Sequence, residues 1–385
     1  MVIQQIFSGS LNNQYNLDEK YLYNICRFFS GSLKIIRKTT MDYSFFQKIL
    51  FSMDAERSHL AALNGLNFLH KLHLDPFATQ TPQVPCKLMD ISLPNPVGLA
   101  AGLDKNGEFI DALAAFGFGF IEIGTVTPKP QAGNPKPRLF RLPEHKAIIN
   151  RMGFNNNGID ALIANVKRSR FDGVLGINIG KNATTPIENA VDDYLICLKK
   201  AYELASYITI NISSPNTKNL RSLQGEDELN ALLAAIKFCQ NDLANQHNKY
   251  VPIALKIAPD LDENQIIAIA KAVRHHQIDG VIATNTTVDK SSLGNHPLSN
   301  EAGGLSGSPL KNKANEVLSL LAKHLNPPNE FVIPIIGVGG ISSGEDAVEK
   351  LQKGASAVQI YSGLIYQGPQ LVRECIHYIQ KYQSA

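Results

Sequence analysis

The sequence of 385 residues lacks the usual marks of a metal-binding or disulfide-linked protein. Its five cysteines, Cys26, Cys86, Cys197, Cys239 and Cys375, are odd in number and widely scattered, without the spacing of metal ligands. We therefore expect reduced, buried thiols rather than disulfides or a zinc site. The ten histidines form no ligand cluster either, so the sequence predicts no metal.

An excess of charge of one sign is also missing. The formal net charge is +3, and no run of lysine or arginine is long enough to line a nucleic-acid groove. The sequence therefore predicts no nucleic-acid partner. With 44% hydrophobic residues, a chain of this length can bury one large core and a small accessory piece.

No Gly-x-Gly-x-x-Gly follows a predicted strand, which disfavours a doubly wound dinucleotide-binding sheet. Short runs rich in Val, Ile and Ala recur instead, each bounded by Gly or Asn. They lie at 97–101, 120–125, 173–180, 207–213, 252–258, 280–285, 333–340 and 357–363. Helical patterns separate most of these runs, and the span from about residue 85 onward matches the roughly 250 to 300 residues of such a fold. We predict an α/β fold, a (β/α)8 TIM barrel.

Helix boundaries can be predicted at two places in this span. An apolar stripe that includes Ile266 and Val273 follows Asp260 and Asp262. A second stripe at 347–351 follows Ser343, which can cap the helix, and Gly354 ends it.

The predicted strands end in residues suited to a planar, phosphorylated, electron-accepting ligand. These ends are Ala100-Ala101-Gly102 with Lys105, then Gly124-Thr125, Asn178, Lys256, Thr284-Asn285-Thr286, the glycine-rich 337–340 and Tyr361-Ser362-Gly363. Barrels commonly bind phosphate after strands seven and eight, where we expect Gly340 and the turn 342–344 to serve. Two lysines at one barrel mouth need counter-charges, because an unpaired buried ammonium is costly. A reduced flavin would supply one of them.

The segment Asn211-Ile-Ser-Ser-Pro-Asn-Thr217 closes the apolar run 207–210. Pro215 prevents the strand from continuing, so the polar side chains of Asn211, Ser214 and Asn216 splay into one loop. In a barrel, chemistry is located at such strand ends. Serine and asparagine are also ordinary turn and N-cap residues, so this segment alone leaves both interpretations open.

Together these motifs resemble the dihydroorotate dehydrogenase family, specifically its quinone-dependent, membrane-associated class. The matching stretches are 100–107, 122–128, 150–155, 211–217, 283–286 and 337–341, which run in order along the barrel. The resemblance implies oxidation of dihydroorotate to orotate in pyrimidine biosynthesis. It also implies FMN as hydride acceptor and a membrane quinone, ubiquinone or menaquinone, as terminal electron acceptor.

The resemblance further implies roles for individual residues. FMN would be held by Ala101, Gly102, Lys105, Thr125, Asn178, Asn211, Lys256, Thr284, Gly307, Gly340, Tyr361 and Ser362. The pyrimidine would contact Lys105, Asn150, Arg151, Met152, Gly153, Phe154, Asn211, Asn216, Asn285 and Thr286. Ser214 would be the catalytic base, and Thr217 and Phe154 would line the route by which its proton leaves.

Ser214 also decides between the classes of the family. A serine hydroxyl is a weak base near neutral pH, and no His-Asp pair follows it in the motif, so it must depend on geometry. By the same resemblance, the soluble classes of the family have a cysteine at the position of the base. The matching loop of this chain has Ser213-Ser214 and no cysteine. The serine therefore favours the quinone-dependent class, with a more closed and drier pocket.

Two amphipathic helices are predicted ahead of the barrel, at 41–53 and 55–72. Phe45, Phe46, Ile49, Leu50 and Met53 share one face of the first, and Leu60, Leu63, Leu66, Leu69 and Leu72 that of the second, which Asp54 caps. From pattern alone they either pack flat on the barrel or form a separate apolar site. The resemblance implies a quinone tunnel with His59, Arg141 and Tyr361 as its polar wall, although a histidine in an apolar helix is often only a packed residue.

We expect three segments, an extension at 1–40, a tunnel segment at 41–80 and a catalytic barrel at 81–385. The extension departs from the bacterial family pattern, which begins near Met41, and contains no run apolar enough to span a membrane. We expect it to be disordered or, through Lys34–Lys38, to touch an anionic membrane surface, and Met41 is an alternative start. The expected location is peripheral, on the cytoplasmic side of a bacterial inner membrane, and the expected state is a monomer.

Other locations and activities fit these residues less well. The mitochondrial inner membrane is the alternative location, but Asp18 and Glu19 argue against a presequence. A flavin-dependent tRNA dihydrouridine reductase would need an additional RNA-binding domain, for which about twenty residues beyond the last predicted strand leave no room. A catalytically silent membrane scaffold would not need Asn, Ser and Lys at so many strand ends.

Overall fold

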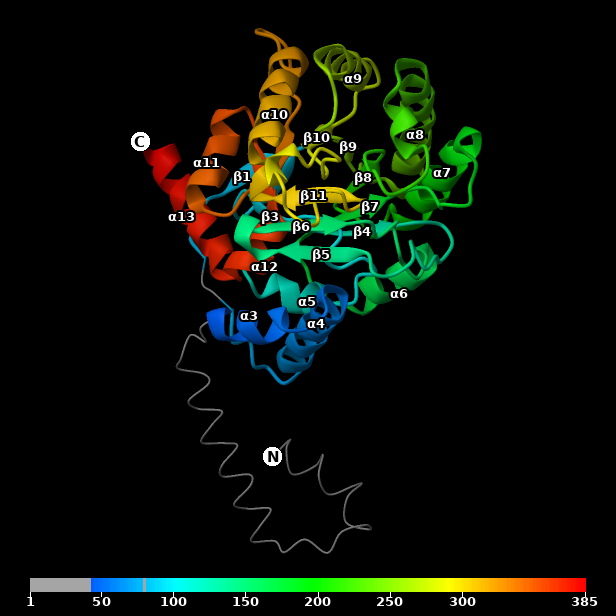
Figure 1. Cartoon of the computed structure of the whole chain (residues 1–385). Coiled ribbons are helices and arrows are strands. Elements are labelled where there is room, and N and C mark those ends of the chain that lie inside the picture. The colour runs from blue at the N-terminus through cyan, green and yellow to red at the C-terminus, as the bar shows by residue number, and fades with distance from the viewer. Residues whose placement is uncertain (1–42, 79–80) are drawn as a thin grey trace, which may run out of the picture.

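A closed barrel of parallel strands forms the centre of the computed structural model, which describes residues 43–78 and 81–385 (Figure 1). Its strands are β3 (Val97–Leu99), β4 (Phe120–Val126), β7 (Val174–Ile179), β8 (Tyr207–Asn211), β9 (Ile253–Ile257), β10 (Gly280–Ala283), β12 (Ile335–Val338) and β13 (Ala357–Ile360). They match the eight predicted runs, and the register Ile360↔Leu99 closes the ring between β13 and β3. The prediction of a (β/α)8 barrel is confirmed.

Helices cover the outside of the barrel. They are α5 (Ile110–Ala114), α6 (Ile159–Arg168), α7 (Ala190–Ala201), α8 (Glu226–His247), α9 (Glu263–His275), α10 (Lys311–Leu325), α11 (Gly344–Gln352), α12 (Ser362–Gln367) and α13 (Gln370–Ser384). The main hydrophobic core lies between these helices and the strands, and a smaller core joins barrel residues such as Phe120 and Tyr207 to Leu88. Both faces of the strands are therefore buried, which explains why their sequences are almost continuously apolar.

The predicted helix starts are also present. Asp262 caps α9 by accepting a hydrogen bond from Gln265 N, and the Gln265 side chain accepts one from Asp262 N. Ser343 caps α11, accepting from Asp346 N at 3.3 Å. The left-handed Gly354 (φ +102°) follows the end of α11.

Two small antiparallel sheets were not predicted. One is a hairpin of β1 (Cys86–Leu88) and β2 (Ile91–Leu93). The other has three strands, β5 (Leu139–Leu142), β6 (Ala147–Asn150) and β11 (Gly304–Gly307), in the order β11-β6-β5. Figure 1 shows this second sheet lying across the barrel. It brings Asn150 and Gly307 from distant parts of the sequence to the barrel mouth.

The N-terminal helices α3 (Tyr43–Phe51) and α4 (Ala55–Lys71) lie together at one end of the molecule (Figure 1). Asp54 caps α4 as predicted, accepting from Arg57 N at 3.0 Å. The pair is tied to the barrel at its edges: Tyr43 OH donates to Ile365 O at 2.8 Å, and Arg138 Nη2 donates to Glu56 Oε1 at 2.8 Å. The extension 1–40 lies outside the described residues.

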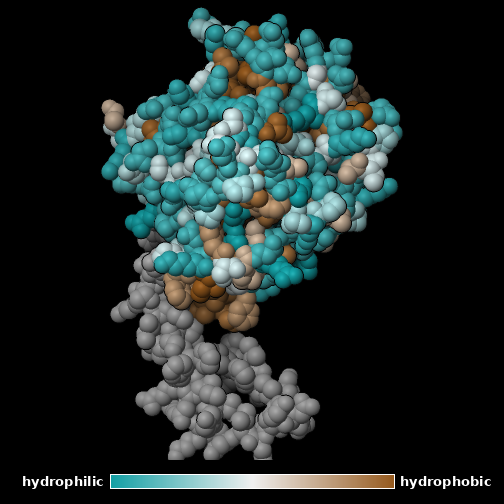
Figure 2. Space-filling view, viewed as in Figure 1, coloured by the Kyte–Doolittle hydropathy of each residue, from teal (hydrophilic) through white to brown (hydrophobic). Residues whose placement is uncertain are grey.

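Several large apolar side chains on these helices face solvent. Phe45 and Phe68 are each 63% exposed, and Leu72 is 53% exposed. Figure 2 shows a hydrophobic patch at this end of the molecule. The rest of the visible surface is mainly hydrophilic (Figure 2). A contiguous apolar patch of this kind typically marks an interaction surface.

Among the buried charges, Lys350 on α11 is unusual because its ammonium has no hydrogen-bond partner within the described part of the chain. Burial lowers its pKa from 10.5 to about 7, although the nearby Glu349 and Asp346 oppose that shift. Between these two values the unfolded chain keeps a proton that the folded chain has released. The free energy of unfolding should therefore rise with pH across this window.

We predict that Lys350→Met stabilises the fold by about 1–4 kcal/mol at pH 7, because it removes an uncompensated buried cation while keeping the side-chain volume. The gain should shrink between pH 7 and pH 10, as the wild-type lysine becomes neutral. Urea unfolding of both proteins across this range measures it. The exposed Lys353, changed to Met, is the matched control. Equal stability of wild type and Lys350→Met at all pH values would contradict the prediction.

Candidate active site

A cavity lined by many polar side chains opens at the carboxyl ends of the barrel strands, with an empty volume of about 1020 Å³ that includes its open mouth. Most of the residues expected to hold the cofactor line its wall: Ala101, Gly102, Lys105, Thr125, Asn211, Lys256, Thr284, Gly307, Gly340, Tyr361 and Ser362. It also includes Ser214 and, of the residues expected to hold the substrate, Asn150, Met152, Gly153, Phe154, Asn216, Asn285 and Thr286. Tertiary structure therefore brings nearly all of the predicted residues into one cavity.

Two of the predicted residues lie outside the cavity wall. Asn178 is fully buried behind it, where its Oδ1 accepts hydrogen bonds from Thr125 Oγ1 (2.5 Å) and Asn211 Nδ2 (3.1 Å). Arg151 forms an ion pair with Glu301 and stacks on the ring of Phe140 at 4.9 Å. Asn178 can therefore orient the wall from behind, whereas the guanidinium of Arg151 is engaged elsewhere.

A buried carboxylate that the sequence analysis did not select lies beneath the cavity. Glu122 on β4 has no exposed surface, and its oxygens accept hydrogen bonds from Asn178 Nδ2, Tyr207 OH and Gln359 Nε2, each at 2.8 Å. Thr209 Oγ1 donates a fourth at 3.2 Å. A lone glutamate in an otherwise apolar strand was the available signal, since such a group is buried only where donors surround it.

Two polar groups beside Glu122 remain free to bind a ligand. Lys256 lines the cavity, and its ammonium makes no hydrogen bond or ion pair to another of the described residues. Burial lowers its pKa, and attraction to Glu122 opposes this shift. Gln359 Oε1 is a buried acceptor with no partner in the same part of the chain. A donor and an acceptor are thus available at the cavity floor.

Glycines let the backbone approach closely at another part of the cavity wall. Gly340 has φ +79°, and a Cβ there would lie 2.4 Å from Lys311 Cα. A Cβ on Gly363 would lie 2.1 Å from the carbonyl oxygen of Ile341. Neither position tolerates a side chain, so the backbone itself forms this wall.

The predicted phosphate turn at 342–344 does not line the cavity. Ser342 N and Ser342 Oγ both donate to Asp346 Oδ2, at 2.8 and 2.9 Å. The hydroxyl of Ser343 caps α11. The prediction for this turn is wrong, because the first turn of the helix binds both serines.

Ser214 is almost fully buried in the loop that follows β8. Its Oγ accepts a hydrogen bond from Asn216 N at 3.2 Å and makes none to a histidine or carboxylate of the described residues. Thr217 Oγ1, in the same loop, is buried without a hydrogen-bond partner in the described structure. Within the described structure, the Ser214 hydroxyl is therefore not hydrogen-bonded to a base.

Amide side chains surround Ser214 and are held in place by other polar groups. Asn216 Nδ2 donates to Asn150 O at 3.1 Å, which joins the Ser214 loop to β6. Asn285 Nδ2 donates to Ser213 Oγ at 2.9 Å, which joins it to the loop after β10. Because these hydrogen bonds engage the Nδ2 groups of Asn216 and Asn285, they fix the orientation in which each side chain can meet a ligand.

Lys105 lies at the edge of the cavity, where its Nζ donates to Gly102 O at 2.8 Å. Burial lowers its pKa to about 8, attraction to Glu56 and Asp104 opposes the shift, and Arg138 adds to it. The ammonium is still mostly charged at pH 7. It can therefore attract an anionic ligand.

A second, mainly apolar cavity of about 1620 Å³ separates α3 and α4 from the barrel. The three residues predicted for a tunnel wall, His59, Arg141 and Tyr361, all line it. Arg141 Nη1 donates to Leu50 O at 3.0 Å, and its guanidinium lies 4.6 Å from the centre of the Phe51 ring. Tyr361 lines both cavities, so they share a wall.

His59 stands between this apolar cavity and a third one of about 700 Å³, which also borders Lys105. Burial lowers the pKa of His59 to about 4, and the charge of Lys105 contributes in the same direction. The imidazole is therefore neutral at pH 7. Across residues 43–78 and 81–385, none of the helices has both the length and the apolar character needed to cross a membrane.

The family model, the relatives and the solved structure that are similar to this chain all carry the name dihydroorotate dehydrogenase. The family model for dihydroorotate dehydrogenase matches residues 84–382. A dihydroorotate dehydrogenase (quinone) of Neisseria meningitidis is 66% identical over 334 residues, which cover 87% of this chain and 98% of the relative. The corresponding protein of Chromobacterium violaceum is 62% identical and covers 90% of this chain and 99% of the relative. The solved dihydroorotate dehydrogenase of Eimeria tenella in complex with ferulenol has a TM-score of 0.76, 36% identity and coverage of 84% and 91%.

We predict that Glu122→Gln lowers the free energy of unfolding by about 3–5 kcal/mol, because it sets an amide donor against existing donors and deprives Lys256 of its negative neighbour. Chemical denaturation of the purified variant measures this. The exposed Glu316 on α10, changed to Gln, is the control and should stay within about 0.5 kcal/mol of wild type. An unchanged denaturation midpoint in Glu122→Gln would show that the carboxylate does not organise the barrel interior.

Proposed function

Because this chain belongs to the dihydroorotate dehydrogenase family, in its quinone-dependent class, we propose that the polar cavity holds FMN and dihydroorotate together. The chain functions in pyrimidine biosynthesis, oxidising dihydroorotate to orotate with a quinone as the acceptor. The observation that carries the proposed arrangement is the wall that Tyr361 contributes to both cavities. It allows one redox group to be reached by a polar substrate from one side and an apolar acceptor from the other.

The family uses a flavin, and the cavity residues fit FMN. The free ammonium of Lys256 suits the carbonyl and negative charge of a pyrimidine edge, and the unpartnered Gln359 Oε1 can accept from its N–H group. The backbone at Gly340 and Gly363 suits the phosphate. When bound there, FMN would supply the chemistry that accepts a hydride from dihydroorotate and transfers two electrons to the quinone.

Ser214 is proposed to take the proton from C5 of the substrate. A serine hydroxyl is a weak base, so its position and the removal of its own proton must compensate. Asn150, Asn216 and Asn285 would hold the pyrimidine and its carboxylate over Ser214, and such orientation can contribute several kcal/mol. The unpaired hydroxyl of Thr217 supports a proton route away from Ser214 past Phe154.

Lys105 is proposed to stabilise the negative charge on substrate and cofactor. Its pKa of about 8 leaves it protonated at neutral pH, and a bound anion would raise that value further. A preorganised charge in a buried site stabilises a bound anion far more than the same charge in water.

Arg151 would contact the substrate through its backbone, because its guanidinium is paired with Glu301.

The apolar cavity is proposed to admit the quinone, ubiquinone or menaquinone. His59, Arg141 and Tyr361 would contact its polar head, and the exposed apolar residues of α3 and α4 would rest on the membrane. Phe45, Phe68 and Leu72 suit a peripheral attachment of this kind. The similarity to bacterial proteins supports a site on the cytoplasmic side of a bacterial inner membrane.

We predict that Ser214→Ala retains FMN but slows flavin reduction by dihydroorotate roughly 10²–10⁴-fold at neutral pH, because the proton acceptor is lost. Stopped-flow bleaching of the flavin measures this step directly. The exposed Ser222 of the neighbouring turn, changed to Ala, is the control. Near-normal bleaching in Ser214→Ala would rule out this serine as the base.

We predict that Ala62→Phe raises the KM for a soluble quinone analogue roughly tenfold, because the added ring fills part of the apolar cavity. Flavin reduction by dihydroorotate should be unchanged, since Ala62 does not line the polar cavity. Asn64→Phe, which places the same ring on the exposed face of α4, is the control. A wild-type KM in Ala62→Phe would argue against quinone access through this cavity.

A further inference from the structure

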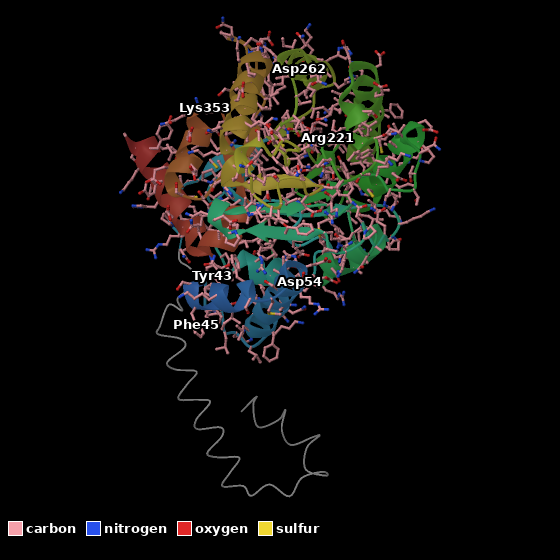
Figure 3. The ribbon with its side chains drawn as sticks, viewed as in Figure 1. Tyr43, Phe45, Asp54, Arg221, Asp262 and Lys353 are labelled. Atoms are coloured by element: carbon pink, nitrogen blue, oxygen red, sulfur yellow. The ribbon has the colours of Figure 1, made fainter. Side chains whose placement is uncertain are left out.

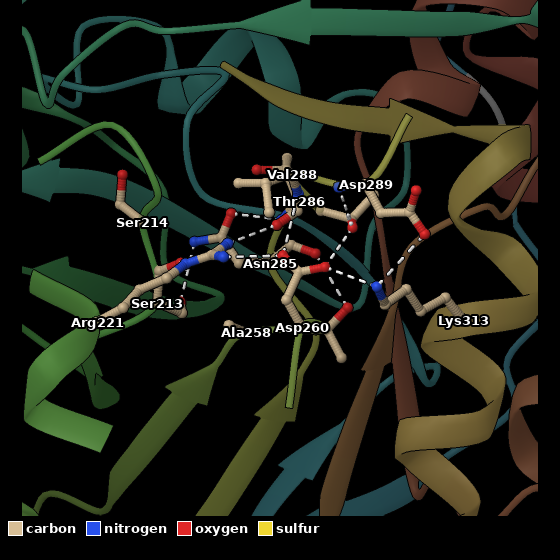
Figure 4. Close-up of polar contacts among 12 residues, drawn as sticks. Ser213, Ser214, Arg221, Ala258, Asp260, Asn285, Thr286, Val288, Asp289 and Lys313 are labelled. Atoms are coloured by element: carbon tan, nitrogen blue, oxygen red, sulfur yellow. Dashed lines mark hydrogen bonds and ion pairs between the residues drawn. The ribbon is translucent and has the colours of Figure 1, made fainter. Parts of the chain in front are cut away.

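Arg221 connects two loops that carry residues proposed to act on the substrate. It belongs to η3 (Leu220–Gln224), beyond the Ser214 loop. Its Nε donates to Ser213 O at 3.0 Å, and its Nη2 donates to Thr286 O at 2.9 Å (Figure 4). One guanidinium thus joins the backbone beside Ser214 to the backbone of the loop after β10.

Asp260 anchors this guanidinium from a third loop, the one after β9. Its Oδ2 accepts from Arg221 Nη1 at 2.8 Å and from Val288 N at 3.0 Å, and Thr287 Oγ1 also donates to the carboxylate. Lys313 on α10 lies 2.8 Å from its other oxygen. The position of Arg221 in the whole molecule can be followed in Figure 3, and Figure 4 shows Arg221 and Lys313 both directed toward Asp260.

The carboxylate of Asp260 is held in its charged form. Burial would raise its pKa, but hydrogen bonds from Lys313, Thr287, Val288 and Arg221 outweigh that effect and lower it. The anchor is therefore negative throughout the neutral range. A charged, multiply bonded group of this kind has a single well-defined position.

The loops are braced at a second point. Asn285 Nδ2 donates to Ser213 Oγ, and Ser213 Oγ donates to Asn211 Oδ1 at 2.9 Å. Ser213 is thus held through both its carbonyl and its hydroxyl. The next residue is Ser214, whose hydroxyl points away from the Arg221 cluster in Figure 4. Arg221 therefore affects Ser214 through the backbone and not by contact.

We propose that Arg221 and Asp260 are positioning residues for proton abstraction, which fix the Ser214 hydroxyl relative to the pyrimidine held by Asn285 and Thr286. This inference rests on the proposed function of Ser214 as the base. A displacement of about 1 Å at a reacting group can cost on the order of 10²-fold in rate. A weak base is especially dependent on such positioning, because geometry must replace basicity.

The arrangement requires an arginine. The planar guanidinium presents donors in a fixed fork, which here reach Ser213 O, Thr286 O and Asp260 at once. A lysine in its place keeps the positive charge and can pair with Asp260, but its flexible ammonium cannot reproduce the fork. Arg221→Lys therefore separates the position of the loops from the charge of the cluster.

The test compares both half-reactions in the full-length, flavin-loaded protein. Arg221→Lys should slow flavin reduction by dihydroorotate about 10²-fold, and Asp260→Asn should slow it in the same direction. Flavin content and reoxidation by a soluble quinone analogue should match wild type, because the quinone is proposed to approach through the other cavity. A purely structural role would lower both half-reactions or the flavin content together.

Arg274 provides a matched control. Its side chain is 25% exposed, against 22% for Arg221, and it also pairs with a carboxylate, that of Glu330. Its Nη1 donates to the carbonyls of Leu325 and Phe331, at 2.6 and 3.2 Å, away from the cavity. Arg274→Lys should leave both half-reactions unchanged.

Wild-type rates of flavin reduction in Arg221→Lys or in Asp260→Asn would overturn the inference, as would equal losses in both half-reactions. Should Arg221→Lys fail to retain flavin, Asp260→Asn alone decides by the same criteria, because it preserves the volume of the side chain. If dihydroorotate does not bleach the wild-type flavin, the proposed function itself fails. The two failures are therefore distinguishable in one set of measurements.

Discussion

The candidate site is organised around a carboxylate buried inside the barrel. Glu122 has no contact with solvent, so each of its oxygens must be satisfied by donors from other strands of the barrel. Asn178, Tyr207 and Gln359 provide these donors, and each thereby loses its freedom to rotate. Lys256 adds a positive charge nearby. The cavity floor is consequently ordered before any ligand arrives, which is what preorganised electrostatics require.

The same principle operates at the cavity mouth, where loops replace strands. Loops are intrinsically less ordered than a barrel, and the residues proposed to hold the substrate lie on several of them. A second, partly buried carboxylate, that of Asp260, binds Arg221 and Lys313 and so joins the loops that follow β8, β9 and β10. The small sheet of β5, β6 and β11 adds Asn150 from the other side. Charge anchors therefore order the floor and the mouth of the cavity alike.

The N-terminal helices follow a different physical rule. They are attached by polar contacts, such as the ion pair of Glu56 with Arg138, and Leu63 packs into the main core, while other apolar side chains of both helices line a cavity between them and the barrel. The low dielectric of that cavity keeps His59 neutral. Tyr361 lines both this cavity and the polar one, so the two cavities share a wall at that residue.

Local patterns along the chain were enough to predict the barrel, because apolar runs bounded by Gly, Asn and Pro are local signals. The same patterns also identified Ser214, the strand-end lysines and the amides as candidate site residues. They could not identify the Glu122 cluster, since Gln359 is 237 residues away from Glu122 along the chain. The Arg221–Asp260 pair and the sheet of β5, β6 and β11 were hidden for the same reason, as their partners meet only in the folded protein. The prediction for the turn 342–344 failed because Asp346, one helical turn later, binds Ser342. Local pattern decides which element forms, whereas the pairing of distant polar groups is decided by the closure of the barrel.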